Sequence, residues 1–388
     1  FKGMMGQSTF PLPQELSEVV LKGEKPLDTL PSKLLPPADF DAIVEKLRKI
    51  NPAAGLRQAI AYCLYPQVVE DFLAGYETYG DISQMPYSVL TSKELRDEFG
   101  QATFFSATDG NHGRGVAWAA NRLGQKCVIR MPVGSTENRR RHIEDEGAEC
   151  TIEKVNYDDC VRMVAEEAKH AERGVVIQDT AWEGYEEIPS WIMQGYSTMA
   201  DEAVEQFEER PTHVFVQAGV GSLAGGVVGY FANKYKKNPP VMVVVEAEPA
   251  ACLYRGAEAA DGEIRIVDGE MPTIMAGLCC GEPNITSWDI LKNHVTAFLA
   301  VNDDVARRGM RMLAAPFKGD PQVVSGESGA ATFGALATIM KDESYRELRL
   351  ELGLNQDSKV LMFSTEGDTD PDRYRDIVWG GQNTDFFN

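Results

Sequence analysis

The chain has 388 residues, of which 43% are hydrophobic and 25% charged, and its formal net charge is −21. This composition is typical of a globular protein, and the length predicts more than one domain. The negative charge argues against nucleic acid and anionic membrane surfaces as partners, because few cations are available to neutralise phosphates. No window approaches about 18 uninterrupted apolar residues, so we expect no membrane-spanning helix.

Residues 1–90 differ in composition from the rest of the chain. Residues 1–50 are rich in proline, leucine and charge, which predicts a peripheral arm followed by an amphipathic helix. Residues 51–80 have helical spacing that Pro66 interrupts. The chain begins without the long apolar stretch of a secretory signal, so we expect a cytoplasmic location.

From about residue 95 onward, short apolar runs alternate with longer segments of helical spacing. This alternation predicts parallel strands that helices cover on both faces. The expected strands are 102–107, 126–132, 148–155, 174–180, 213–219, 241–248 and 359–365, and the expected helices are 115–125, 137–147, 157–171, 190–207 and 225–235. The two groups predict two open α/β domains, a smaller one over 91–195 and a larger one over 196–388. Residues 1–90 are expected to pack partly on the larger domain.

Four polar clusters follow strands of this predicted pattern. In parallel sheets, ligands bind at the carboxyl ends of the strands, where helix N-termini present unpaired N–H groups. We therefore expect the four clusters to meet in a cleft between the two domains.

The first cluster, "SATDGNHGRG" (residues 106–115), combines polar side chains with three glycines. The glycines allow a flat ligand to lie against the backbone. Asn111 is a candidate to bond a ring substituent, and Asp109 adds a carboxylate, with Thr108 beside it in the cleft. His112 fits either a structural capping role or a direct role in the site.

The second cluster, "QAGVGSLAGG" (residues 217–226), follows a strand and opens a helix. Its glycines and the helix N-terminus favour a phosphate cradle, and a tight structural turn is the alternative. The stretch from Gly219 to Ala224 also matches G-x-G-x-x-A, and the next strand ends at Glu246 and Glu248. A dinucleotide site therefore remains an alternative.

The other two clusters supply one candidate carboxylate and two candidate hydroxyls. Asp179 follows a strand, and Trp182 and Tyr185 are expected to wall it, which suits an acid or base as well as a helix N-cap. Ser364 and Thr365, at the end of the last strand, are candidates to bond a heteroaromatic ring nitrogen or to form a surface turn.

Seven cysteines are scattered along the chain, mostly in apolar contexts, which favours buried and reduced thiols. Cys252 is also a candidate to pair with Cys279 or Cys280, and the sequence does not decide between these alternatives. The five histidines and the cysteines lack the spacing of metal ligands, so we expect no bound metal.

Seven stretches together resemble the pyridoxal-phosphate lyases of the tryptophan-synthase-β fold, which is fold type II. They are "TDGNHGRGVAWAA", "QDTAWEGY", "MQGYSTMADEA", "QAGVGSLAGG", "TIMAGLCCGEPN", "SGESGA" and "STEGDTD". The resemblance covers about residues 95–378, in the family's order. It is strongest to diaminopropionate ammonia-lyase, because Asp109 stands where serine/threonine dehydratases have another residue.

The resemblance implies pyridoxal 5'-phosphate as cofactor and elimination of ammonia from 2,3-diaminopropionate or a related amino acid, in a homodimer. It implies that Asp109 and Asp179 are the acid and base. It further implies that Asn111 and His112 contact the cofactor ring, and that Ser364 or Thr365 bonds its nitrogen. The phosphate would lie on residues 219–223, which are Gly219, Val220, Gly221, Ser222 and Leu223.

The family's lysine motif, which attaches the cofactor covalently, is absent from this sequence. The most similar stretch is "PAAGLRQAIAY", where Arg57 stands at the place of the lysine. A guanidinium stays protonated and does not attack an aldehyde. We therefore expect Arg57 to line the cleft and not to attach the cofactor. The alternatives to a lyase are a repurposed fold type II homologue without this lysine, which acts as another lyase or isomerase or only binds, and a nicotinamide-dependent enzyme.

Overall fold

The computed structural model describes Ala42, Glu45 and residues 87–381. The chain divides into two compact units, Phe1–Ser92 and Lys93–Asn388. The first unit contributes the short helix α6 (Tyr87–Leu90) to the described residues. The predicted arm and helices over residues 1–90 lie almost wholly outside the described residues. Arg57 lies outside them as well.

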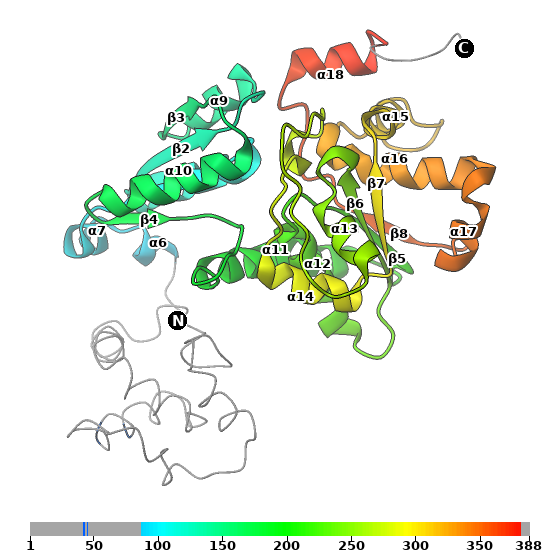
Figure 1. Ribbon diagram of the computed structural model, residues 1–388, viewed down its shortest axis with the longest axis horizontal. Coiled ribbons are helices and arrows are strands. Elements are labelled where there is room, and N and C mark those ends of the chain that lie inside the picture. Colours follow the sequence, from blue (N-terminus) through cyan, green and yellow to red (C-terminus); the bar gives the residue numbers. More distant parts are fainter. Residues whose placement is uncertain (1–41, 43–44, 46–86, 382–388) are drawn as a thin grey trace. The chain divides into compact units, whose positions relative to one another are not determined.

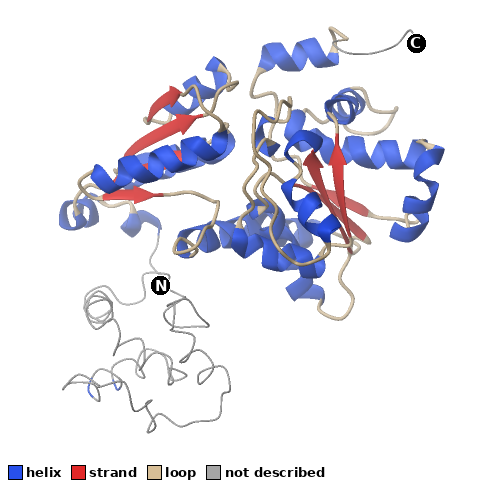
Figure 2. Ribbon diagram, viewed as in Figure 1, coloured by secondary structure: helices blue, strands red, loops and turns tan. Residues whose placement is uncertain are grey.

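The second unit begins with a four-stranded parallel sheet in the order β3-β2-β1-β4 (Figures 1 and 2). Its elements are α7 (Lys93–Phe99), β1 (Thr103–Ala107), α8 (Asn111–Leu123), β2 (Lys126–Met131), α9 (Glu137–Glu144), β3 (Glu149–Ile152), α10 (Tyr157–His170) and β4 (Gly174–Val176). Phe105 and Ala107 pack on α10, whereas Ile129 and Met131 pack on α8 and α9. Helices therefore cover both faces, as the apolar strands predict.

A second four-stranded parallel sheet follows, in the order β7-β6-β5-β8. Its strands are β5 (His213–Gln217), β6 (Val241–Ala247), β7 (Ala297–Val301) and β8 (Val360–Met362). Its helices are α11 (Glu187–Gln206), α12 (Ser222–Tyr235), α13 (Cys252–Ala259), α14 (Ile285–His294), α15 (Asp303–Ala314), α16 (Glu327–Lys341), α17 (Arg346–Leu352) and α18 (Pro371–Val378), with 3-10 turns η2 (Glu248–Ala250), η3 (Ala276–Leu278) and η4 (Glu343–Tyr345).

Alternate residues of β5 and β6 enter two separate cores. Val214 and Val244 face one core, which α12 and α14 complete, and Phe215 and Val243 face another, which α15 and α16 complete. Successive side chains of a strand point to opposite faces, so a strand with both faces buried is apolar throughout. The prediction of two parallel-sheet α/β regions is confirmed.

Both sheets have the same strand order, in which the first strand of each lies inside and pairs with the last. In the first sheet the strand order reverses between β1 and β4, and in the second between β5 and β8, although each pair of strands is parallel. Ligand sites of open parallel sheets lie at such switch points, outside the carboxyl ends of the strands. The four predicted polar clusters are the four loops at these two points.

The structure differs from the sequence prediction in several places, and helices α13 to α18 were not among the expected helices. Strand β7 (Ala297–Val301) was not expected, and α8 begins at Asn111 instead of residue 115. The boundary predicted between residues 195 and 196 falls inside α11, which is continuous and packs against α12. Helix α11 therefore belongs with the second sheet.

The backbones of helices α15 and α16 are in contact where the helices cross, and each helix has a glycine at that point. A Cβ on Gly309 would overlap the carbonyl oxygen of Ala330, and one on Gly334 would overlap that of Val305. Backbone contact of this kind requires that both helices lack a side chain at the crossing.

We expect Gly309→Ala to lower the free energy of unfolding by about 1–3 kcal/mol, because the added methyl forces the helices apart. Gly229→Ala in α12 is the matched control, since its Cβ would lie 3.6 Å from Ile290 and meet only ordinary contact. Alanine there should stabilise the helix by up to about 1 kcal/mol. Urea unfolding of both variants checks this, and equal midpoints would contradict the argument.

Candidate active site

A cleft of about 550 Å³ lies at the two switch points. Its size suits a small-molecule ligand. It is lined by Thr108, Asp109, Asn111 and His112 after β1, Ile177 and Asp179 after β4, Gln217 and residues 218–223 at β5, and Thr365 after β8. Helix α11 adds Tyr196, and residues 277–280 add Gly277, Leu278 and Cys280. The structure therefore brings together most of the residues that the sequence singled out.

The turn after β1 is organised by one buried hydroxyl. Thr108 Oγ1 accepts hydrogen bonds from the N–H groups of Gly110 (2.9 Å) and Gly113 (3.0 Å). A Cβ on Gly113 would overlap the Thr108 side chain, so glycine is required there. This turn starts α8 at Asn111 and places Asp109 at the cleft.

Asp109 is a carboxyl group whose surroundings oppose ionisation. Burial raises its pKa above the ordinary value, Arg139 opposes that rise, and Glu366 adds to it. The Arg139 guanidinium lies 3.5 Å from Asp109 Oδ2. Repulsion from Asp179 is a lesser cause. Burial, and not repulsion from the second carboxylate, is therefore the main cause of the raised pKa of Asp109.

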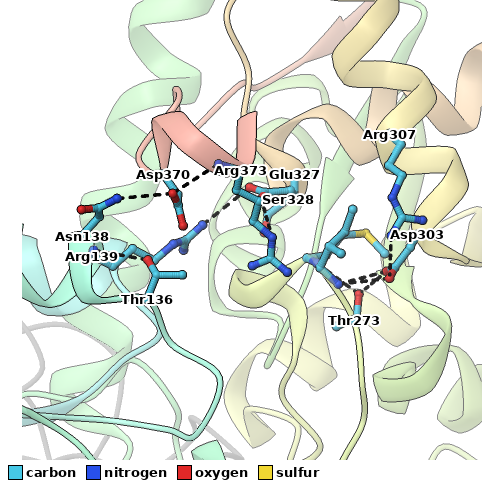
Figure 3. A network of polar contacts seen from close by, with 12 residues as sticks. Thr136, Asn138, Arg139, Thr273, Asp303, Arg307, Glu327, Ser328, Asp370 and Arg373 are labelled. Carbon is cyan, nitrogen blue, oxygen red and sulfur yellow. Dashed lines mark hydrogen bonds and ion pairs between the residues drawn. The ribbon is translucent and has the colours of Figure 1, made fainter. Parts of the chain in front are cut away.

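Arg139 is shared by three carboxyl groups from different elements. Its side chain is 3% exposed and lies 3.5 Å from Glu366 and 3.7 Å from Glu327, in addition to Asp109. Figure 3 shows Arg139 reaching toward Glu327, which Arg373 of α18 contacts from the other side at 3.5 Å. These contacts tie α9 of the first sheet to α16 and to the loop after β8.

Hydrogen bonds fix both the carboxylate and the backbone carbonyl of Asp179. Tyr196 Oη donates to Oδ2 at 3.2 Å, and Gln178 Nε2 donates to Oδ1 at 3.4 Å. Its backbone carbonyl accepts from Ser222 Oγ (2.6 Å) and from Asn284 Nδ2 (2.8 Å). The loop after β4 is thereby fixed to the start of α12.

The glycine-rich turn after β5 leads directly into α12. Gly221 has φ +100°, in the left-handed region, and the helix begins at Ser222. The first N–H groups of a helix lack partners within it and carry partial positive charge, so this turn can bind an anion. Gly225 and Gly226 allow close helix packing instead, because a Cβ on either would overlap α14 or α11.

Gln217 supplies a polar atom without a partner at the base of the cleft. Its Nε2 donates to Thr365 Oγ1 (2.9 Å) and to the Phe363 carbonyl (3.0 Å), while its buried Oε1 has no hydrogen bond. The Thr365 hydroxyl accepts from Gln217, which leaves its own proton free to be donated. Ser364 does not line the cleft and bonds Ser325 Oγ at 2.8 Å.

Some predicted residues lie elsewhere or have other partners. Trp182 and Tyr185 line a separate cavity of about 780 Å³, where their rings stack at 4.3 Å, and they do not line the cleft. The Tyr185 hydroxyl bonds Val176 and Gln178 of the protein interior. His112 Nε2 lies 2.9 Å from the Ile177 carbonyl, and Asn111 Nδ2 donates to Glu366 at 3.3 Å. His112 thus has a structural partner while it lines the cleft.

Neither acidic residue named for the dinucleotide alternative lines the cleft, and Glu248 is exposed and lines a separate cavity. Glu246, at the end of β6, is 1% exposed and accepts the N–H groups of Leu253 (2.9 Å) and Tyr254 (2.7 Å). Both oxygens are therefore used at the start of α13, and neither is presented to a ribose.

Other predicted properties concern thiols, metals and membranes. The six cysteines that the structure describes are free, including Cys252, Cys279 and Cys280. Within residues 87–381, no group of three histidine, cysteine, aspartate or glutamate side chains is placed to hold a metal. None of the helices found there has the length and apolar character needed to cross a membrane.

The fold and the cleft define a class, and comparison with known proteins agrees with it. Residues 85–363 match the family described as pyridoxal-phosphate dependent enzyme, and the chain belongs to this family. Diaminopropionate ammonia-lyase of Salmonella typhimurium is 50% identical over 308 residues, which are 78% of this chain and 76% of that protein. The Escherichia coli diaminopropionate ammonia lyase solved with D-serine has 45% identity and a TM-score of 0.72, over 81% of this chain and 78% of that one.

These matches confirm the resemblance, with the pyridoxal-phosphate cofactor and the ammonia-lyase function that it implies. A second family covers the start of the chain: residues 1–104 match the conserved carboxylase domain. Pyruvate carboxylase of Bacillus subtilis is 39% identical over 104 residues, which are 25% of this chain and 9% of that protein. The two family matches overlap only over residues 85–104.

Sequence reasoning missed four residues of the site. Each of them contacts a predicted residue. Arg139, Tyr196 and Gln217 stand in segments whose helix or strand patterning explains them, and Glu366 is one of several acidic residues in the loop after β8. Their role depends on which elements meet, so a single sequence offers no local signal for them.

We expect Arg139→Met to destabilise the protein by about 3–5 kcal/mol, because it leaves buried carboxylates without their cation. Arg139 lowers the pKa of Asp109 and of Glu327, so both rise further in the variant. A carboxyl group whose pKa is higher in the folded state than in the unfolded state makes the protein less stable as pH rises. The destabilisation by Arg139→Met should therefore be larger at about pH 8 than at about pH 5.

Urea unfolding at both pH values measures this effect. Arg141→Met, on the exposed side of the same helix, is the control and should change stability little. A loss that does not depend on pH would show that Arg139 acts by packing alone.

Proposed function

We propose that this chain eliminates ammonia from 2,3-diaminopropionate, or from a closely related amino acid, with pyridoxal 5'-phosphate as cofactor. One observation carries the proposal: the loops at both switch points place two carboxyl groups and a helix N-terminus around a single cleft. An anion site beside an acid and a base is what such an elimination requires.

The cofactor's phosphate is assigned to the turn after β5. Residues 219–223 offer backbone N–H groups at the start of α12, and the Ser222 hydroxyl is fixed by Asp179 and Asn284. The ring is assigned to the space between Asn111 and Thr365, with the Thr365 hydroxyl toward its nitrogen. The free Gln217 Oε1 accepts a hydrogen bond from the bound group.

Bound pyridoxal phosphate supplies an electron-withdrawing ring that stabilises negative charge at the α-carbon of an amino acid. The chain's own residues move the protons. Asp179, oriented by Tyr196 and Gln178, accepts the α-proton. Asp109, whose pKa is raised by burial, is assigned the delivery of a proton to the departing β-amine.

The charge of the cleft suits a substrate that carries two amino groups. Among the residues lining it are two carboxyl groups, and none is lysine or arginine. The β-amino group can hydrogen-bond to these carboxyl groups, whereas a second substrate carboxylate would be repelled by Asp179. The substrate's one carboxylate fits the N-terminus of α8, where Asn111 and His112 begin the helix.

We also propose that the enzyme is a cytoplasmic homodimer. The dimer rests on the family resemblance. Buried free thiols such as Cys127, Cys160 and Cys252 support a reducing compartment.

We expect pyruvate and ammonia to form when the protein is incubated with 2,3-diaminopropionate and pyridoxal phosphate. Asp109→Asn and Asp179→Asn should each lower the rate by at least about 100-fold, because a proton donor or acceptor is lost. Asp289→Asn is the control, since its side chain is 73% exposed on α14. Unchanged rates in both site variants would contradict the assigned roles.

Static light scattering tests the dimer separately. We expect a mass twice that of one chain at micromolar concentration. A single-chain mass would remove the homodimer from the proposal and leave the assignment of the cleft intact.

A further inference from the structure

The lysines of this chain are placed differently from what covalent attachment of the cofactor needs. A lysine that attacks the cofactor's aldehyde must reach into the cleft, and a dry environment favours its reactive neutral form. Every lysine of residues 87–381 is exposed. None of them lines the cleft. Several are held at the surface in ion pairs, such as Lys93 with Asp97 and Lys292 with Asp289.

The sequence ahead of the cleft offers no substitute. No lysine occurs between Lys49 and Lys93, the stretch that leads into the first strand of the site. The match to the pyridoxal-phosphate family begins only at residue 85. The lysines further upstream are Lys2, Lys22, Lys25, Lys33, Lys46 and Lys49, and all lie within the stretch that matches the conserved carboxylase domain.

The remaining contacts of the cofactor are nevertheless in place. Ser222 at the helix N-terminus, Thr365 with its hydroxyl, and Gln217, whose Oε1 is unpaired, all line the cleft. They bind a phosphate and an aromatic ring by hydrogen bonds and by charge, without any covalent bond. The cleft therefore fits the cofactor in every part except the group that would hold its aldehyde.

We infer that this chain holds pyridoxal phosphate by non-covalent contacts alone and leaves the aldehyde unattached. The inference rests on the proposed function, because it concerns the same cleft and the same cofactor. It has a direct physical consequence: the bound cofactor exchanges freely with solution, and dialysis removes it.

The experiment uses the full chain incubated with pyridoxal phosphate. Equilibrium dialysis measures binding, and borohydride reduction followed by peptide mass mapping reveals any lysine joined to the aldehyde. Exposed lysines react with free pyridoxal phosphate at random, so a variant with a blocked phosphate site is needed for comparison.

Leu223→Glu provides this comparison. The residue lies in the first turn of α12, where an acidic side chain favours the helix but repels phosphate. We expect it to weaken binding at least about tenfold relative to the neutral variant Leu223→Gln, by charge repulsion. Circular dichroism of the two variants should be the same.

The inference is supported if binding saturates, falls in Leu223→Glu, and leaves the same scattered lysine labelling in wild type and variant. A lysine labelled in the wild type and spared in Leu223→Glu, at any position of the chain, would overturn the inference and leave the proposed function standing. If the wild type shows no saturable binding, both the inference and the proposed function fail.

Discussion

The site depends on the strand order that both sheets share. In each of them the chain starts in the interior, builds outward to one edge, and returns to pair with the first strand on its other side. Parallel strands end at one edge of a sheet, so the loops after the first and the last strand have to be neighbours there. This geometric constraint brings Asp109 beside Asp179, and the turn at Gly221 beside Thr365, from positions far apart in the sequence.

Electrostatics then joins the two sheet regions. Arg139 comes from a helix of the first sheet, and two of its three carboxyl partners, Glu327 and Glu366, come from the second. A buried guanidinium among three carboxyl groups leaves an excess of negative charge, which is costly unless one group holds a proton. Asp109 is the member of this cluster that also reaches the cleft, so the network that connects the sheets adjusts the acid of the site as well.

Local pattern was enough to predict most strands and helices around the site, because a strand with two buried faces is apolar throughout. Strand β7 was missed because its sequence, residues 297–301, is flanked closely by helices α14 and α15 rather than by a recognisable loop motif. The loops could be predicted because polar residues and glycines follow the strands. Trp182 and Tyr185 show the limit of that reasoning: proximity to Asp179 in the sequence does not decide into which cavity their rings turn.

Asn284 shows how tightly the loops are connected. Its amide donates to the Asp179 carbonyl and to Ser222 Oγ, both at 2.8 Å, and its Oδ1 accepts the N–H of Ser287 at 3.0 Å. Aspartate lacks the two protons, glutamine is one methylene longer, and serine is too short to span the three partners. This position therefore has no conservative replacement, and a substitution there disconnects the segments on either side of the cleft at once.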